Sequence, residues 1–249
     1  MRFWLWVMPS PQHQRERTVR EIFNGVAGRY DLLNRVISFH FDTLWRRQAV
    51  NSLHLAGLTA RVLDLGTGTG DLALAAAAAL GPQGKVLGLD FAPEMLRLAK
   101  VKSEKHPCGG KTRFVLGSAV RAPFRSDAFD AVMTAFVLRN VSDLSLFFVE
   151  AHRVLKPGGR VAALDMFPPS KGLFSCIYAL YFYHLVPWIG AGLARRRDAY
   201  GYLSQSVKGF MAPEAVADIM REAGFQSVRI KRFLRGAVCL HVAEKPVER

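Results

Sequence analysis

The chain has 249 residues, of which 50% are hydrophobic, so it can bury one large core, and we expect a single α/β domain rather than two. Its three cysteines lie far apart without a CxxC pair, which argues against a disulfide framework and a zinc site, so we expect no bound metal. The formal net charge of +14 favours an anionic partner such as a lipid surface. No aromatic-interleaved RNA-binding motif accompanies the scattered basic residues, so we do not expect nucleic acid.

Two apolar segments bear on the membrane question. Residues 1–9 are too short for a signal peptide and lack a small-residue cleavage site, so we assign residues 1–13 to a tail and 14–249 to one domain. Residues 172–194 are long enough to span a membrane. His184 and Pro187 interrupt this stretch, however, and strand-like segments on both sides of it must join one sheet. We therefore predict a cytoplasmic protein with an insertion at about 171–210.

Taken in chain order, the pattern begins with helix over residues 14–56, broken near Gly28 and Ser38, and continues as strands alternating with helices. The predicted strands are 61–66, 85–90, 112–117, 130–136, 160–167, 227–233 and 237–244. The later predicted helices are 72–80, 93–102, 145–155 and 213–223. This alternation predicts a parallel sheet covered on both faces, with the ligand at the carboxyl ends of its strands. The last two strands predict an antiparallel hairpin at the sheet edge.

A glycine turn follows the first strand, in VLDLGTGTGDLAL at residues 62–74. Its GxGxG spacing differs from the GxGxxG fingerprint of dinucleotide-binding folds. Asp71 stands in the first turn of the next helix, where its carboxylate opposes the phosphate that a helix N-terminus otherwise attracts. The turn therefore favours a neutral or cationic ligand, with NAD as the alternative.

Two further strand ends indicate what that ligand is. Asp90 ends the second strand, 20 residues beyond Gly70, which is the position from which an acid binds ribose hydroxyls. The third strand ends in Gly117-Ser118-Ala119, which can contact an adenine edge. A nucleoside with a positive group in place of phosphates fits all three features, so we predict S-adenosyl-L-methionine as the cofactor.

Five segments together resemble the menaquinone and ubiquinone biosynthesis C-methyltransferases of the UbiE/MenG type, which are class I methyltransferases. The segments are YDLLNRVISFHFDTLWRR at 30–47, TGD at 69–71, FVLRNVSD at 136–143, RVLKPGG at 153–159 and YGYLSQSV at 200–207. The resemblance runs from about Val19 to Lys245. It implies a Rossmann-like, seven-stranded, mostly parallel sheet with an antiparallel edge strand, N-terminal helices and an aromatic helical insertion before the last two strands.

The resemblance also places the cofactor contacts. The residues expected to bind the cofactor are Asp64, Gly66, Thr67, Gly68, Thr69, Gly70, Asp90, Phe91, Ser118, Ala119 and Ala135. The family usually has serine at the position of Ala135, so we expect only a backbone contact there. Asp42 and Thr43 stand where the family has histidine and arginine, which puts the particular quinone substrate in question.

The implied reaction methylates a ring carbon, which becomes nucleophilic when a neighbouring hydroxyl loses its proton. By the resemblance, Arg139 and Asn140 face the substrate, and Tyr30 completes the hydrogen-bond set. A guanidinium stays protonated, so we expect Arg139 to stabilise the phenolate and orient a water that accepts the proton. The alternatives are a salt bridge at a strand end for Arg139 and a structural tie for Tyr30. We expect His40 and His184 to be packed rings rather than bases.

The insertion carries large rings at helical spacing: Tyr178, Tyr181, Phe182, Leu185 and Trp188. We interpret them as a lid over a prenyl tail, with Arg195, Arg196 and Arg197 on anionic headgroups at the inner face of the membrane; the alternative is a helix packed on the core.

The predicted function is methylation of a prenylated quinol, either demethylmenaquinol or 2-polyprenyl-6-methoxy-1,4-benzoquinol. Alternatives are another lipid acceptor such as a phospholipid amine, cofactor binding without turnover, and RNA methylation. The candidate assemblies are a homodimer and a quinone-biosynthesis complex.

Overall fold

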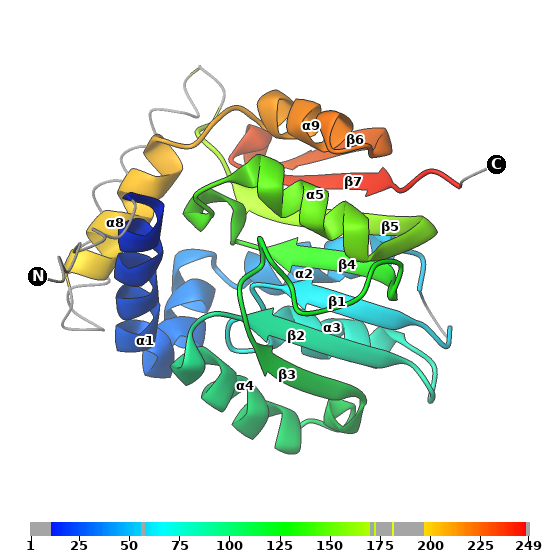
Figure 1. Ribbon diagram of the computed structural model, residues 1–249. Coiled ribbons are helices and arrows are strands. Elements are labelled where there is room, and N and C mark those ends of the chain that lie inside the picture. Colours follow the sequence, from blue (N-terminus) through cyan, green and yellow to red (C-terminus); the bar gives the residue numbers. More distant parts are fainter. Residues whose placement is uncertain (1–10, 56–57, 170–171, 173–180, 182–196, 248–249) are drawn as a thin grey trace, which may run out of the picture.

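A seven-stranded sheet forms the centre of the computed structural model, which describes residues 11–55, 58–169, 172, 181 and 197–247. The strand order is β3-β2-β1-β4-β5-β7-β6 (Figure 1). The strands are β1 Arg61–Leu65, β2 Lys85–Asp90, β3 Thr112–Leu116, β4 Phe129–Ala135, β5 Leu155–Met166, β6 Gln226–Phe233 and β7 Val238–Glu244. Strands β1 to β5 pair in parallel, and β7 pairs antiparallel with both β5 and β6. The predicted mostly parallel sheet with an antiparallel edge is therefore confirmed.

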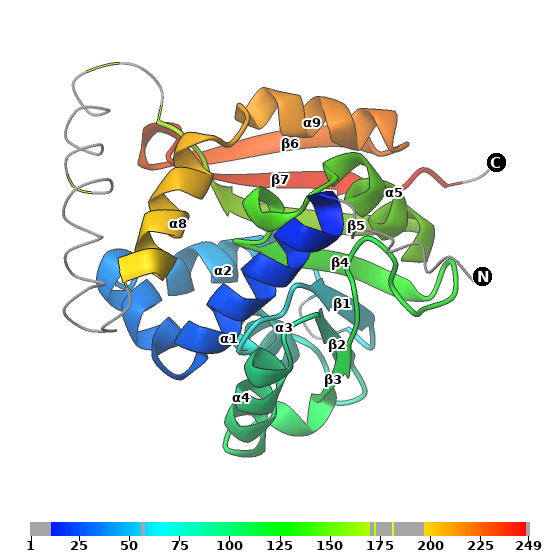
Figure 2. The ribbon, with the colours of Figure 1, turned by 60° about the vertical axis from the view of Figure 1, so that its left-hand side comes forward.

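Helices cover both faces of this sheet and its carboxyl end. They are α1 Pro11–Ile37, α2 Phe41–Ser52, α3 Asp71–Ala79, α4 Pro93–Glu104, α5 Leu144–Val154, α8 Arg197–Lys208 and α9 Pro213–Glu222. Helices α2 and α3 pack on one face around Leu72, and α5 and α9 pack on the other around Phe147 and Met220. Helices α1 and α8 lie beyond the carboxyl ends of the parallel strands, beside the predicted ligand site (Figures 1 and 2).

The structure corrects two predicted boundaries and confirms a third. Helix α1 runs through Gly28 without a break, because a glycine inside an amphipathic helix weakens it but does not stop it. The second predicted break is confirmed: α1 ends at Ile37, and Phe39 and His40 have left-handed backbone angles before α2 begins. Strand β5 begins at Leu155 rather than at residue 160, because Leu155 pairs with Phe129 ahead of a β-bulge.

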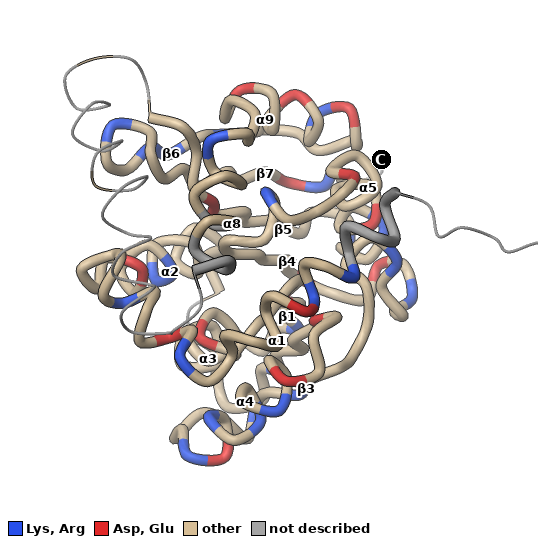
Figure 3. Tube along the Cα trace, turned by 90° about the vertical axis from the view of Figure 1, so that its left-hand side faces the viewer, with Lys and Arg blue, Asp and Glu red and all other residues tan. Residues whose placement is uncertain are grey.

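Among the described residues, no helix combines the length and the apolar character needed to cross a membrane. Most of the predicted lid, including Tyr178, Phe182, Leu185, Trp188 and Arg195, lies outside the described residues. The described Tyr181 stacks on Phe39 with ring centroids 5.6 Å apart, and its hydroxyl donates to the Ile37 carbonyl over 2.8 Å. Lysines and arginines are spread over several elements rather than gathered on one (Figure 3).

Candidate functional site

The glycine turn between β1 and α3 is tightly enclosed. Gly66, Gly68 and Gly70 all have positive φ angles, of 73°, 54° and 85°. The N–H groups of Gly66 and Thr67 donate to the Leu89 carbonyl over 2.8 and 3.0 Å, which fixes the turn against β2. A Cβ atom at Gly66 would lie 2.5 Å from a methyl carbon of Val137. Only glycine therefore fits where the turn passes under the residues that follow β4.

Asp90, at the end of β2, holds the turn from the other side. Its two carboxylate oxygens accept the N–H groups of Gly68 and Ala92 over 2.8 and 2.9 Å. Burial raises the pKa of Asp90, and these hydrogen bonds oppose the rise. Each carboxylate oxygen has a second lone pair, so Asp90 can still accept hydroxyl groups from a bound ribose.

Two adjoining pockets meet at Asp90. The Ser118 pocket, of about 580 Å³ including space open to solvent, is lined by Asp90, Phe91, Ser118, Ala119 and Asn140, among others. The Tyr30 pocket, of about 390 Å³, is lined among others by Tyr30, Gly66, Gly68, Asp90, Phe91, Ala135 and Asn140. The structure thus brings together most of the predicted cofactor and substrate residues. Asp64, Thr67, Thr69, Gly70 and Arg139 do not line either pocket.

Asp64 and Thr67 lie beneath the turn. The Thr67 hydroxyl donates to Oδ2 of Asp64 over 2.7 Å, whereas the buried Oδ1 of Asp64 has no hydrogen-bond partner among the described residues. Burial raises the pKa of Asp64 to about 7, although Thr67 and Arg46 oppose the rise. A buried carboxyl group with one unpartnered oxygen favours its protonated form, because burying an unpaired charge is costly.

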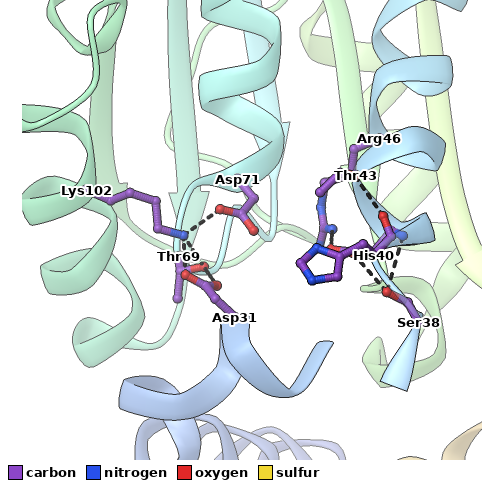
Figure 4. Close-up of polar contacts among 9 residues, drawn as sticks. Asp31, Ser38, His40, Thr43, Arg46, Thr69, Asp71 and Lys102 are labelled. Carbon is purple, nitrogen blue, oxygen red and sulfur yellow. Dashed lines mark hydrogen bonds and ion pairs between the residues drawn. The ribbon is translucent and has the colours of Figure 1, made fainter. Parts of the chain in front are cut away.

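Thr69 and Gly70 face the helices instead. The Thr69 hydroxyl donates to Oδ1 of Asp31 on α1 over 2.5 Å and accepts from Nζ of Lys102 on α4 over 3.1 Å (Figure 4). Gly70 packs against Ala99 of α4, where an added Cβ would lie 3.2 Å from the alanine methyl group. The side chain of Thr69 is therefore engaged by protein groups, and neither residue opens into a pocket.

Asp71 is not the lone carboxylate that the sequence suggested. Its Oδ1 lies 2.5 Å from Nζ of Lys102, which also forms an ion pair with Asp31 (Figure 4). Burial alone would raise the pKa of Asp71, but Lys102 and Arg46 outweigh it and hold the pKa below its ordinary value. Two carboxylates around one ammonium leave a net charge of −1, so the repulsion of phosphate belongs to this group rather than to Asp71 alone.

Arg139 lies in the 3-10 turn η2 Leu138–Asn140, directly after β4. Its buried guanidinium forms an ion pair with the fully buried Asp165 of β5, which is the salt bridge weighed as an alternative from the sequence. The Asn140 side chain donates to the Phe136 carbonyl over 3.3 Å and accepts from the Tyr202 hydroxyl over 3.1 Å. Of the two, only Asn140 lines the pockets.

Two arginines lie over the ring of Phe136, which lines the same pocket as Tyr30. The guanidinium carbon of Arg46 lies 5.0 Å from the centre of this ring, and that of Arg139 lies 5.9 Å from it. Burial raises the pKa of Tyr30, while a hydrogen bond with Asn34 and the charges of Arg139 and Arg46 oppose the rise. The electrostatic contacts of Tyr30 with both arginines bring the predicted substrate residues into one region.

The departures at Asp42 and Thr43 have a structural explanation. Asp42 is buried, accepts the Ser38 hydroxyl over 2.9 Å and forms an ion pair of 2.5 Å with Arg46, one helical turn away. Thr43 is exposed, and its hydroxyl donates to the His40 carbonyl over 2.8 Å. His40 is exposed too, so the expectation of a packed ring is wrong. Asp42 therefore positions Arg46, and Thr43 does not reach the pockets.

Residues 11–245 match the profile of the ubiE/COQ5 methyltransferase family. The chain belongs to that family. A demethylmenaquinone methyltransferase of Thermus thermophilus is 44% identical over 225 residues, covering 90% of this chain and 100% of its own length. One from Deinococcus radiodurans is 41% identical, covering 94% and 95%.

Solved structures agree with the fold of this methyltransferase. An S-adenosylmethionine-dependent methyltransferase from Aquifex aeolicus superposes with a TM-score of 0.58 at 20% identity, covering 80% of this chain and 88% of that one. The [4+2]-cyclase SpnF superposes with a TM-score of 0.65 at 18% identity, covering 97% and 99%. These likenesses concern the fold alone. The family assigns S-adenosyl-L-methionine as the cofactor of the chain.

The residues present fit this cofactor. A ribose acceptor at Asp90 and a glycine turn in which a Cβ at Gly66 has no room suit a nucleoside, and the net negative charge of Asp31, Asp71 and Lys102 suits one that carries positive charge. In the described part of the chain, no group of histidine, cysteine, aspartate and glutamate side chains is arranged to hold a metal ion.

Sequence reasoning missed four residues of this region, namely Asp31, Arg46, Lys102 and Asp165. Asp31 and Arg46 lie inside the segment 30–47 that carries the family resemblance, so their proximity to the site could have been inferred. Lys102 and Asp165 reach the site only through the packing of α4 and β5, for which the sequence offers no local signal.

Proposed function

We propose that this methyltransferase transfers the methyl group of S-adenosylmethionine to a ring carbon of demethylmenaquinol, in menaquinone biosynthesis. Two relatives named demethylmenaquinone methyltransferase, 44% and 41% identical over nearly their whole length, support the acceptor. The structural observation that carries the proposal is the Tyr30 pocket, which is lined both by the glycine turn and Asp90 and by Tyr30, Phe23, Phe136 and Asn140. An aromatic acceptor would thus lie directly beside the donor.

The donor would be held by residues at the carboxyl ends of β1, β2 and β3. Asp90 would accept the ribose hydroxyls, Ser118 and Ala119 would border the adenine, and the backbone of Gly66 and Gly68 would line the floor. Ala135 offers only its backbone and methyl group. S-adenosylmethionine supplies a methyl group on a positively charged sulfur, open to in-line displacement. The main task of the protein is to hold both partners in attack geometry, which can supply about 7–11 kcal/mol.

On the acceptor side, the ring carbon gains nucleophilic character when a neighbouring hydroxyl loses its proton. Arg139 stays protonated, so its role in the proposal is to stabilise the phenolate, and the ion pair with Asp165 fixes the orientation of its guanidinium. Tyr202 and the Phe136 carbonyl orient the Asn140 amide. In this scheme Tyr30 and Asn140, which line the Tyr30 pocket, position a water molecule that accepts the proton. The buried charge of Arg139 acts on the phenolate without lining the pocket.

The test is an acceptor panel with purified protein and methyl-labelled S-adenosylmethionine. The panel contains demethylmenaquinol, 2-polyprenyl-6-methoxy-1,4-benzoquinol and phosphatidylethanolamine. We expect label in demethylmenaquinol, loss of transfer in Arg139→Met, and unchanged transfer in the control Arg97→Lys, which alters an exposed ion pair on α4. Label in another acceptor with none in demethylmenaquinol would contradict the proposal.

We also propose that the reaction takes place at an anionic membrane surface. A prenylated acceptor resides in the bilayer, and the junction of α1 and α2, which we call the α1–α2 corner, exposes five large apolar side chains. They are Leu32 (52%), Val36 (37%), Phe39 (70%), Phe41 (46%) and Leu44 (54%). The left-handed backbone at Phe39 and His40 makes the corner tight. An exposed apolar cluster on a chain of net charge +14 suits insertion between anionic headgroups.

Vesicle co-sedimentation tests this location. Phe39→Ser with Leu44→Ser should reduce binding to vesicles that contain phosphatidylglycerol, whereas Leu146→Ser with Val149→Ser, two residues of α5 that are both 52% exposed, should bind like wild type. Equal binding by both double variants would remove the corner from the proposal. A large loss of thermal stability in the corner variant would mean that another part of the chain covers it.

A further inference from the structure

A carboxylate of the N-terminal helix is bound to the glycine turn. Asp31 of α1 accepts the Thr69 hydroxyl over 2.5 Å and forms an ion pair with Nζ of Lys102. Lys102 also donates to Thr69 over 3.1 Å, so one hydroxyl and one ammonium converge on the same carboxylate (Figure 4). We call these two groups the Thr69–Lys102 site. Its chemistry is that of a carboxylate-binding site, and Asp31 fills it.

This contact closes α1 over the donor pockets. Val19 lines the Ser118 pocket, and Phe23 and Tyr30 line the Tyr30 pocket, so one wall of each belongs to α1. Thr69 itself is buried. A ligand therefore reaches the Thr69 hydroxyl only when Asp31 withdraws from it.

The donor brings a carboxylate of its own, at the end of its amino-acid chain. In the described part of the chain, the cations near the turn include Arg35, whose charge acts on Asp71, as well as Arg46, Lys102 and Arg139. Arg46 and Arg139 are each locked in a buried ion pair, with Asp42 and Asp165. The Lys102–Asp31 pair differs, because its side chains are 27% and 23% exposed and it joins two separate helices. A partly solvated pair between elements exchanges far more readily than a buried pair.

Charge balance decides how the exchange must occur. Lys102 already carries two carboxylates, those of Asp31 and Asp71. A third carboxylate would place three negative charges around one ammonium, which is strongly unfavourable. Asp71 is fixed in the first turn of α3, whereas Asp31 belongs to the helix that covers the pockets. Asp31 is therefore the carboxylate that can leave.

We propose that the Thr69 hydroxyl and the Lys102 ammonium bind the amino-acid carboxylate of the donor, and that Asp31 competes for this site as an internal mimic of that carboxylate. Binding of the donor displaces Asp31 and loosens α1, and release of the product lets Asp31 return. The inference concerns the donor side alone and holds whichever acceptor the enzyme uses.

Two ligands separate this mechanism from a general effect on the pocket. S-adenosylhomocysteine carries the carboxylate, whereas 5′-(3-aminopropylthio)-5′-deoxyadenosine keeps the nucleoside, the thioether and the ammonium but lacks the carboxylate. Their affinities are measured by titration calorimetry on the full chain without any acceptor. The outcome is thus independent of the acceptor panel described above.

The variants are Asp31→Ala, Lys102→Met and Lys102→Arg, with Lys100→Met as the control, an exposed lysine two residues away on the same helix. Removing the competitor in Asp31→Ala should tighten S-adenosylhomocysteine about two- to fivefold, without tightening the decarboxylated analogue. Lys102→Met should weaken S-adenosylhomocysteine about tenfold or more and change the analogue much less. Lys102→Arg should retain most of the affinity, and Lys100→Met all of it.

Equal changes for both ligands in Asp31→Ala, or in Lys102→Met, would overturn the proposal, because neither residue would then sense the carboxylate. Thermal melting of each variant identifies any loss of folding. If Lys102→Met does not fold, Asp31→Ala and Lys102→Arg still test the proposal. Only the loss of a competing carboxylate would tighten S-adenosylhomocysteine without tightening the analogue that lacks the carboxylate.

Discussion

The buried carboxylate of Asp64 gives the sharpest prediction about stability. It lies at the end of β1 beneath the glycine turn and is 1% exposed, with Thr67 on one oxygen and no described partner on the other. Burial raises its pKa to about 7, against an ordinary value of 3.8. The folded protein therefore holds a proton on Asp64 over a pH range in which the unfolded chain has already lost it.

The sign follows from proton linkage. Between the unfolded and folded pKa values the native state binds one more proton, so the free energy of unfolding falls by about 1.4 kcal/mol per pH unit as pH rises. Over the span from 3.8 to about 7 this amounts to about 4 kcal/mol, and the effect levels off above the folded pKa. Asp64→Asn has no such proton. Burying its amide has a cost that does not vary with pH.

Urea unfolding of wild type and Asp64→Asn, followed by circular dichroism from about pH 5 to pH 8, measures this difference. The variant should gain about 2–3 kcal/mol relative to wild type across that range. Asp130→Asn is the opposite control, because hydrogen bonds from Arg61 and Lys156 outweigh burial and lower the pKa of Asp130. This variant should be less stable than wild type by a constant amount at higher pH, and the difference in the free energy of unfolding should shrink only below about pH 4. A constant difference between wild type and Asp64→Asn would refute the reasoning.

Three further predictions concern the site. Gly66→Ala should abolish binding of S-adenosylhomocysteine in calorimetry, because its Cβ has no room. Gly28→Ala has open space around it in α1 and should raise the free energy of unfolding by about 0.5–1 kcal/mol; retained binding in Gly66→Ala would contradict the tight turn. Arg139→Met should cost about 3–5 kcal/mol in urea unfolding by stranding Asp165, and Arg139→Met with Asp165→Leu should restore stability but not methylation. Asp90→Ala should weaken S-adenosylhomocysteine by about 1–3 kcal/mol, and unchanged affinity would exclude it as the ribose acceptor.

The strands and the glycine turn could be predicted because their signals are local. Apolar runs such as Arg61–Leu65 and Lys85–Asp90 coincide with strands, and the glycines of the turn need positive φ angles that other residues avoid. The predicted helix break at Gly28 was wrong because a glycine inside a helix only lowers its stability, and packing of the helix compensates for this loss.

Electrostatic partners could not be predicted in the same way. The sequence gives no sign that α4 places Lys102 beside Asp71. Arg139 was expected to face the substrate, with a salt bridge as the alternative, and its partner Asp165 comes from β5. Both partners come from elements distant in sequence, so their identity depends on tertiary packing rather than on any motif. The residue types around the glycine turn could be predicted, whereas their charge balance could not.

The chemical identity of the product tests the central claim most directly. Purified enzyme, demethylmenaquinol and S-adenosylmethionine labelled with carbon-13 in the methyl group should give a methylated quinol whose carbon spectrum shows the label as an aryl methyl group. A label that appears as a methoxyl group, or on a lipid amine with the quinol unchanged, would contradict carbon methylation of demethylmenaquinol.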